Sequence, residues 1–163
     1  MSEKLILIDG HSILNRAFYG VPDLTNAEGL HTNAVYGFLN IMLKILEEEK
    51  AEHLAVAFDQ PEPTFRHKMF DAYKGTRKPM PEELHEQVPL MKEVLTAMGV
   101  PILTKEGYEA DDILGTIAKR EQKDGYEVTI LSGDRDLLQL SDTHIRICLP
   151  KTSRGTTEVH NYY

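Results

Sequence analysis

Three short apolar runs, each followed closely by an aspartate, constrain the fold of this chain more than any other feature. Residues 5–8 precede Asp9, residues 53–58 precede Asp59, and residues 128–131 precede a Ser-Gly pair and Asp134. Continuous apolar runs of this length are typical of strands buried on both faces of a sheet. Segments with helical spacing lie between them. The alternation predicts an α/β fold with a mainly parallel twisted sheet and helices on both faces.

The helical segments have recognisable beginnings and ends. Residues 33–46 carry apolar side chains at three- and four-residue spacing, with the N-cap at residue 32 or 33. Residues 81–99 form a second helix, which Pro89 kinks or splits in two because proline removes a helical hydrogen bond. A third helix is predicted at 109–123, before an Asp-Gly stop. The remaining expectations are a turn at 151–155 and a short strand at 157–160.

The aspartates that follow the strands are expected to share one edge of the sheet. In open parallel sheets the ligand crevice lies outside the carboxyl ends of the strands, where Asp9, Asp59 and Asp134 belong. The structural alternative is local, because Asp-Gly after a strand is a common turn and Asp9-Gly10 reads as one. One such aspartate alone therefore carries little functional weight.

A group of acids at the start of the third helix is harder to explain as local structure. Glu109, Asp111 and Asp112 lie within four residues, whereas capping and the helix dipole account for one acid, at about 0.3–1 kcal/mol. Asp134 and Asp136 follow the third strand, where an Asp-rich turn with a helix cap is the alternative. Acids converging on one edge repel one another unless hard cations take their oxygens. We therefore predict a site for two divalent ions, Mg²⁺ or Mn²⁺, of the kind that hydrolyses phosphodiesters.

A basic segment interrupts the strand–helix alternation between residues 59 and 81. Arg66, Lys74, Arg77 and Lys78 lie in it, and Tyr73 offers a ring on which a base could stack. The alternative is a solvated loop whose charges do nothing specific. The acidic constellation favours phosphate contact, although the net charge of the chain is −8, because metal-bound carboxylates no longer repel a phosphate.

Composition bounds the remaining possibilities. The 163 residues suffice for one domain, spanning 1–163, with a sizeable core. The apolar run at 5–8 is too short for a signal peptide or a membrane span, which predicts a cytoplasmic protein with no membrane partner. A single cysteine, Cys148, excludes an intrachain disulfide. The histidines have no zinc-ligand spacing.

Taken together, these residues resemble the 5′-nuclease domain at the N-terminus of bacterial DNA polymerase I, a relative of flap endonucleases and phage 5′-exonucleases. The resemblance covers essentially the whole chain, in blocks that follow one another in order. They are residues 7–10 through Arg16, then 34–38, 58–59, 65–67, 73–75, 107–112 and 134–137.

The resemblance implies a PIN-like fold and a metal-dependent 5′-3′ exonuclease and structure-specific 5′-flap endonuclease. Its implied role is the removal of RNA primers and displaced strands in DNA replication and repair, near the bacterial nucleoid. By similarity, one metal is associated with five acids and a second metal with two more. The first set is Asp9, Asp59, Glu109, Asp111 and Asp112, and the second is Asp134 and Asp136.

The resemblance also implies roles for basic and aromatic residues. Lys74 and Arg16 would contact the scissile phosphate, and Tyr73 would help to place the terminal nucleotide. Residues 65–89 correspond to a helical arch through which a single-stranded 5′ arm passes. The residues expected to line that arch and bind DNA are Arg66, Arg77 and Lys78.

The chain departs from the family pattern at its end. The family continues past Tyr163 with a further aspartate pair for the second metal and a helix–turn–helix element that binds duplex DNA. The second metal site is therefore expected to be incomplete in this chain, and a polymerase region is expected in the same natural protein. Two alternatives stay open: a non-catalytic fragment that binds metal and single-stranded DNA weakly, and a stand-alone PIN-like ribonuclease.

Overall fold

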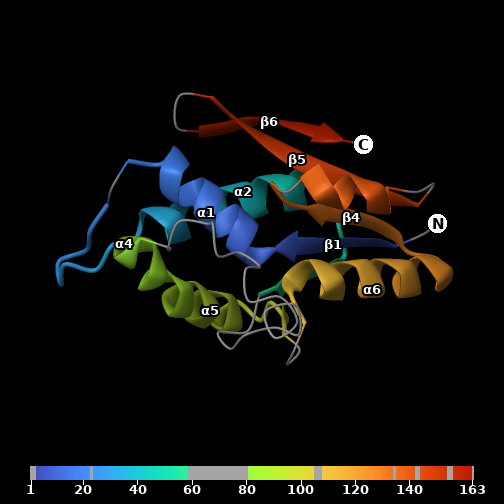
Figure 1. The fold of residues 1–163 in the computed structure, drawn as a ribbon, viewed down its shortest axis with the longest axis horizontal. Helices are drawn as coiled ribbons and strands as arrows, with labels where there is room; N and C mark the ends of the chain where they lie inside the picture. The colour runs from blue at the N-terminus through green and yellow to red at the C-terminus, as the bar shows by residue number, and fades with distance from the viewer. Residues whose placement is uncertain are drawn as a thin grey trace, which may run out of the picture.

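The computed structural model describes residues 3–22, 24–58, 81–104, 108–133, 135–141, 144–153 and 156–162, with backbone alone for 135, 136, 138, 150–153 and 156–162. Six strands form one sheet in the order β3-β2-β1-β4-β5-β6 (Figure 1). The strands are β1 Lys4–Asp9, β2 His53–Ala57, β3 Ile102–Leu103, β4 Glu127–Leu131, β5 Ile145–Ser153 and β6 Thr156–Tyr162. The helices are α1 Gly10–Gly20, α2 Asn33–Glu49, α4 Glu82–His85, α5 Gln87–Ala97, α6 Ala110–Lys123 and the 3₁₀ helix η1 Arg135–Leu140.

The sheet has the predicted mainly parallel topology. Strands β3, β2, β1, β4 and β5 pair in parallel, and only β6 pairs antiparallel, with β5. The register pairs Asp9 of β1 with Ala57 of β2, and Ile8 with Leu131 of β4. The carboxyl ends of the three predicted strands are therefore level with one another.

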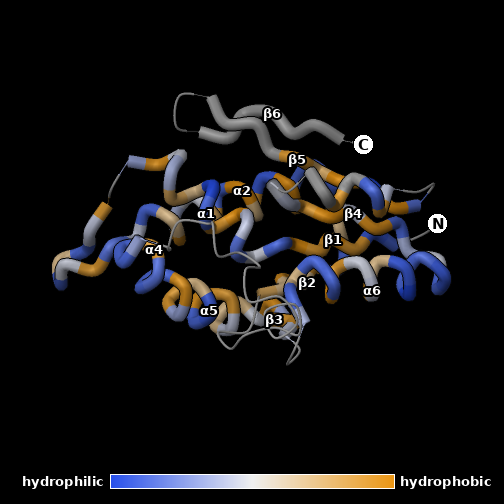
Figure 2. Tube along the Cα trace, viewed as in Figure 1, coloured by the Kyte–Doolittle hydropathy of each residue, from blue (hydrophilic) through white to orange (hydrophobic). Residues whose placement is uncertain are grey.

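Helices cover both faces of the sheet, as predicted. Alternate residues of β1 point to opposite faces, so Ile6 and Ile8 pack with α1, α2 and α5, while Leu7 packs with α6 and η1. Figure 2 shows the apolar residues concentrated along the central strands β1 and β4. Both faces of the sheet are buried, which explains why its central strands read as continuous apolar runs.

The predicted helices are confirmed, with one refinement. Helix α2 has Thr32 as its N-cap, and α6 has Glu109. The helix predicted at 81–99 is split in two at Glu86, three residues before Pro89. The break precedes Pro89 because a proline ring clashes with the backbone carbonyl four residues earlier in a continuous helix. Within the first turn of α5, the missing N–H of the proline costs nothing, because N–H groups there have no partner inside the helix.

Two local predictions were wrong, and strand β3 was not predicted, because its two residues are too few to produce a sequence pattern. Asp9-Gly10 is not a turn, because α1 begins at Gly10 directly after β1. The turn predicted at 151–155 is wrong for residues 151–153, which continue β5. The strand predicted at 157–160 is confirmed, since it lies within β6. Residues 154 and 155 lie outside the described part of the chain.

Two glycines allow helix α1 to approach its neighbours closely. A Cβ atom at Gly10 would lie 2.6 Å from the Phe58 ring and 2.8 Å from the carbonyl oxygen of Ala57. A Cβ atom at Gly37 of α2 would lie 2.7 Å from the Cβ of Ala17 in α1. Both distances are impossible for real side chains, so any larger residue would displace α1 from the sheet or from α2.

A buried polar network joins α5 to the start of α2 and the end of α1. The Oε1 atom of Gln87 accepts hydrogen bonds from the backbone N–H groups of Ala34 and Val35, at 2.7 and 3.2 Å. Its Nε2 donates to Asn33 Oδ1 and to the Glu83 carbonyl, both at 2.9 Å. The Asn33 amide in turn donates to the carbonyls of Phe18 and Val21. Gln87 thus caps α2 from another helix, since Thr32 makes no side-chain cap.

Replacing Gln87 with leucine is expected to lower the free energy of unfolding by about 3 kcal/mol, because it leaves buried donors of α2 without an acceptor. Gln87 is fully buried. Urea unfolding followed by circular dichroism measures the change, and Gln139→Leu, at an exposed position of η1, is the matched control. Equal losses for the two variants would show that the network does not stabilise the fold.

Among the helices that the structure describes, none has both the length and the apolar composition needed to cross a membrane.

Candidate metal centre

Asp9 lies at the carboxyl end of β1 and does not act as a local turn or cap residue. It occupies the N-cap position of α1, but its side chain makes no capping hydrogen bond. Instead Oδ2 accepts a hydrogen bond of 3.0 Å from the hydroxyl of Ser132, at the end of β4. The side chain is largely buried, with 8% of the residue exposed. A buried carboxylate directed at the sheet edge fits a ligand-binding role better than a turn.

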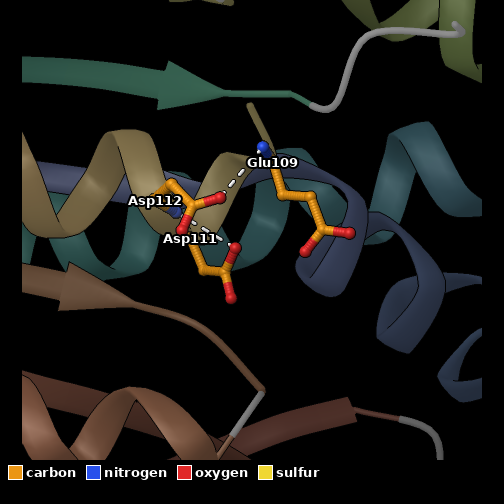
Figure 3. Close-up of side chains that lie close together, drawn as sticks. All are labelled: Glu109, Asp111 and Asp112. Carbon is orange, nitrogen blue, oxygen red and sulfur yellow. Dashed lines mark hydrogen bonds between the residues drawn. The ribbon is translucent and has the colours of Figure 1, made fainter. Parts of the chain in front are cut away.

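The start of α6 gathers three carboxylates in one place. Glu109, Asp111 and Asp112 each offer one oxygen, and the three oxygens lie within 4.8 Å of one another. Figure 3 shows Glu109 arriving from the chain before the helix, with Asp111 and Asp112 in its first turn. The predicted acidic group at this helix start is therefore assembled in space.

Capping accounts for part of this arrangement. Asp112 Oδ2 accepts a 3.2 Å hydrogen bond from the Glu109 N–H, and Asp111 Oδ1 accepts one of 3.0 Å from the Asp112 N–H, both drawn as dashed lines in Figure 3. Glu109, which is 4% exposed, also forms a capping box with Asp112, so these two acids both cap α6 as well as crowding together with Asp111. Three crowded carboxylates are the donor set that Mg²⁺ or Mn²⁺ prefers, and a divalent cation would relieve their repulsion.

Arg16 brings a positive charge to the same edge of the sheet. It lies on α1, and a Cβ atom at Gly133, after β4, would be 3.5 Å from one of its terminal guanidinium nitrogens. Among the residues that the structure describes, nothing accepts a hydrogen bond from its buried Nε. A buried, unsatisfied guanidinium donor beside an acidic site is suited to hold an anionic oxygen such as that of a phosphate.

The predicted site residues divide into three groups. Asp9, Arg16, Glu109, Asp111 and Asp112 are described, although Asp9 is not a member of the three-carboxylate group. Asp136 lies in η1, where only the backbone is described. The others lie outside the described residues: Asp59, Arg66, Tyr73, Lys74, Arg77, Lys78 and Asp134.

Two serines at the site were not anticipated from the sequence. Ser132 contacts Asp9, and Ser12 of α1 accepts a 2.8 Å hydrogen bond from the Gly133 N–H. The sequence indicates their place at the site only weakly. Ser132 is the residue immediately after a predicted strand, and Ser12 is three residues after a strand-end aspartate. Their contact depends on the register of β1 against β4, which no local pattern contains.

A groove of about 510 Å³ lies at the opposite end of the sheet. Its walls come from the beginnings of β1 and β2, the loop before β3, and the later turns of α6, including Leu5, His53, Pro101 and Ile117. None of the acidic residues of the metal centre lines it. Its position places it apart from the carboxylates.

The fold is that of the phage 5′-exonucleases. A structure of the bacteriophage T5 5′-exonuclease with divalent metal ions (zinc) bound aligns with a TM-score of 0.68 at 22% identity, over 89% of this chain and 54% of that one. The T5 flap endonuclease in a pseudo-enzyme-product complex with DNA and metal ions aligns with a TM-score of 0.67, at the same identity and coverage. The likeness at this identity concerns the fold, which is the PIN-like α/β arrangement predicted from the sequence.

The family follows from the sequence comparison. The family model described as the 5′-3′ exonuclease, N-terminal resolvase-like domain matches residues 4–163, so the chain belongs to this nuclease family. DNA polymerase I of Bacillus caldotenax is 49% identical over 162 residues, which are 99% of this chain and 18% of that protein. The chain spans 18% of the length of the DNA polymerases I of Bacillus caldotenax, Geobacillus stearothermophilus and Bacillus subtilis.

Proposed function

We propose that this chain is a metal-dependent 5′-3′ exonuclease and structure-specific 5′-flap endonuclease that hydrolyses phosphodiester bonds in DNA with two metal ions. The observation that carries the proposal is the group of Glu109, Asp111 and Asp112, with oxygens within 4.8 Å, in a chain of the 5′-3′ exonuclease family. The substrates are DNA with a 5′ flap or a single-stranded 5′ end, and RNA primers paired to DNA.

The acidic residues would hold the ions. Asp9, Asp59, Glu109, Asp111 and Asp112 would hold one, and Asp134 and Asp136 a second, with Mg²⁺ or Mn²⁺ as the cations. When bound, such ions supply a hydroxide nucleophile near neutral pH and neutralise charge on the leaving oxygen. The chain's own contribution is to fix the carboxylates at strand ends and at the start of α6, where no reorganisation is needed during reaction.

Cationic and aromatic residues would bind the nucleic acid. Arg16 has the buried, unsatisfied Nε described above, which supports a role at the scissile phosphate. Lys74 would share that role, and Tyr73 would stack on the terminal nucleotide. Residues 65–89 would form the helical arch over a single-stranded 5′ arm, with Arg66, Arg77 and Lys78 along it. Residues 81–89 of this range are described, with α4 at Glu82–His85 and α5 beginning at Gln87.

The relatives support a place in replication and repair. The chain matches the start of much longer DNA polymerases I, which favours a polymerase region in the same natural protein and a role at the bacterial nucleoid, in the cytoplasm. Its work there would be to remove primers and displaced strands.

Cleavage of an end-labelled 5′-flap DNA with Mg²⁺ or Mn²⁺, compared with cleavage of plain single-stranded RNA, tests this function. We expect the flap to be cut near its junction, with EDTA abolishing the product. Binding of single-stranded DNA with no product under any metal would favour the non-catalytic fragment. Faster cleavage of the RNA would favour the stand-alone ribonuclease.

Lys74→Ala is expected to slow flap cleavage about 100-fold, because one electrostatic contact to the transition state is lost. The melting temperature should stay unchanged, because a lysine in a predicted loop has few packing partners. Lys123→Ala, at an exposed position in the last turn of α6, is the matched control. A large drop in melting temperature for Lys74→Ala would contradict this placement.

A further inference from the structure

Two serine hydroxyls, one in the first turn of α1 and one at the end of β4, form a chain of contacts that ends at the Asp9 carboxylate. The Gly133 N–H donates to Ser12 Oγ at 2.8 Å, the two hydroxyl oxygens lie 3.4 Å apart, and Ser132 Oγ lies 3.0 Å from Asp9 Oδ2. The chain of contacts bridges residues more than 120 positions apart in sequence. It ends on Asp9, a proposed metal ligand, and lies beside Arg16.

The direction of these hydrogen bonds follows from the number of protons available. An ionised carboxylate only accepts, so the single hydroxyl proton of Ser132 goes to Asp9. At the contact between the serines, Ser132 must then accept and Ser12 must donate. Each hydroxyl thus accepts one hydrogen bond and donates the next, from the Gly133 N–H to the carboxylate, and such chains polarise and strengthen their members.

The surroundings hold this chain of contacts in one arrangement. Ser132 is completely buried and Asp9 is 8% exposed. A Cβ atom at Gly133 would lie 3.1 Å from Ser12 Oγ, so the backbone after β4 sits directly against α1. Ser12 and Arg16 share one face of α1, four residues apart; Ser12 accepts the Gly133 N–H, and Arg16 lies beside Gly133. A hydroxyl in so confined a place has little rotational freedom to lose when it bonds Asp9.

We propose that Ser132, supported by Ser12, is a positioning residue that holds the Asp9 carboxylate in the orientation in which it binds a divalent cation. The inference rests on the proposed function, because it takes Asp9 as a metal ligand. Hydrogen bonds to the ligand carboxylates are a general means of orienting metal ligands, and their loss weakens metal binding about 10- to 100-fold. The alternative is that Ser132 merely satisfies its own hydroxyl and contributes to stability alone.

Metal titration of Ser132→Ala, in the absence of DNA, separates these two roles. Mn²⁺ binding to the intact chain is measured by electron paramagnetic resonance, and the melting temperature is measured without metal. We expect Mn²⁺ to bind about tenfold more weakly than to the unchanged chain. Ser141→Ala, at an exposed position, is the matched control and should leave Mn²⁺ affinity unchanged. A lower melting temperature with unchanged Mn²⁺ affinity would overturn the proposal.

Ser12→Ala provides a second measurement at a half-buried position. It should weaken Mn²⁺ binding less than Ser132→Ala does, and the double variant should match Ser132→Ala, because the contribution of Ser12 passes through Ser132. If Ser132→Ala does not fold, unchanged Mn²⁺ affinity in Ser12→Ala overturns the proposal. An unchanged chain that binds Mn²⁺ but cuts no DNA would refute the nuclease function, while the effect of Ser132→Ala on Mn²⁺ affinity would still test the positioning role.

Discussion

Replacing Asp112 with asparagine is expected to slow phosphodiester cleavage about a thousandfold, equivalent to about 4 kcal/mol, because a proposed metal ligand loses its charge. The substitution should not destabilise the fold. The asparagine oxygen can still accept the Glu109 N–H that Asp112 Oδ2 accepts at 3.2 Å. Without metal the melting temperature should be unchanged or slightly higher, because one of three crowded negative charges is gone.

Metal-dependent stability gives this prediction a second readout. A cation that binds only the folded chain raises its melting temperature, and this increase should nearly vanish in Asp112→Asn. Asp112→Ala should in addition lower the free energy of unfolding by about 1 kcal/mol, because the capping acceptor is lost. Asp124→Asn, at the exposed C-cap of the same helix, makes the same charge change and should alter neither cleavage nor metal response. Full activity in Asp112→Asn would remove Asp112 from the ligand set.

Phe38→Ala should have the largest effect on stability, a loss of about 3–5 kcal/mol in the free energy of unfolding. Phe38 lies on α2, is fully buried, and packs in the core between the helices and the sheet. Removing its ring leaves a cavity that the rigid sheet cannot fill. Urea unfolding should show a lower midpoint with an unchanged slope.

A matched position on the same helix controls for helix propensity. Leu43 is 52% exposed, so Leu43→Ala should cost about 0.5 kcal/mol or less. Equal losses at the two positions would contradict the assignment of Phe38 to the core. The flap-cleavage rate of Phe38→Ala, measured well below its melting temperature, should equal that of the unchanged chain, because Phe38 is not a residue of the metal centre.

Much of the site was predictable because its residues belong to elements with strong local signals. Glu109 precedes a clear helical pattern, and Asp9 ends an apolar strand, so topology brought both to the carboxyl edge of the sheet. The contact between Ser132 and Asp9 was not predictable, because it depends on which strands become neighbours. Arg16 could be assigned only by resemblance, since α1 itself was not anticipated.

The missed parts of the fold share a physical cause, which is that tertiary contacts decided them. Helix α1 starts at a glycine that usually marks a turn, because only glycine fits against Phe58 there. Strand β5 continues through Pro150, which lies beyond Cys148, the last β5 residue that pairs with β4, so the proline removes no hydrogen bond from that pairing. In the sequence, Gln87 looks like an ordinary polar helix residue. Its burial follows from the hydrogen bonds that it accepts from the start of α2, which no local sequence pattern contains.

The close contact at Gly10 also has a consequence for how this protein can change over generations. Because no side chain fits between Gly10 and Phe58, the backbone that carries Asp9 and the backbone that ends β2 cannot shift independently. A substitution at Gly10 would move Asp9, a proposed metal ligand, as well as a helix, and few compensating changes could restore both. Sequence drift at this edge must therefore proceed in coupled steps.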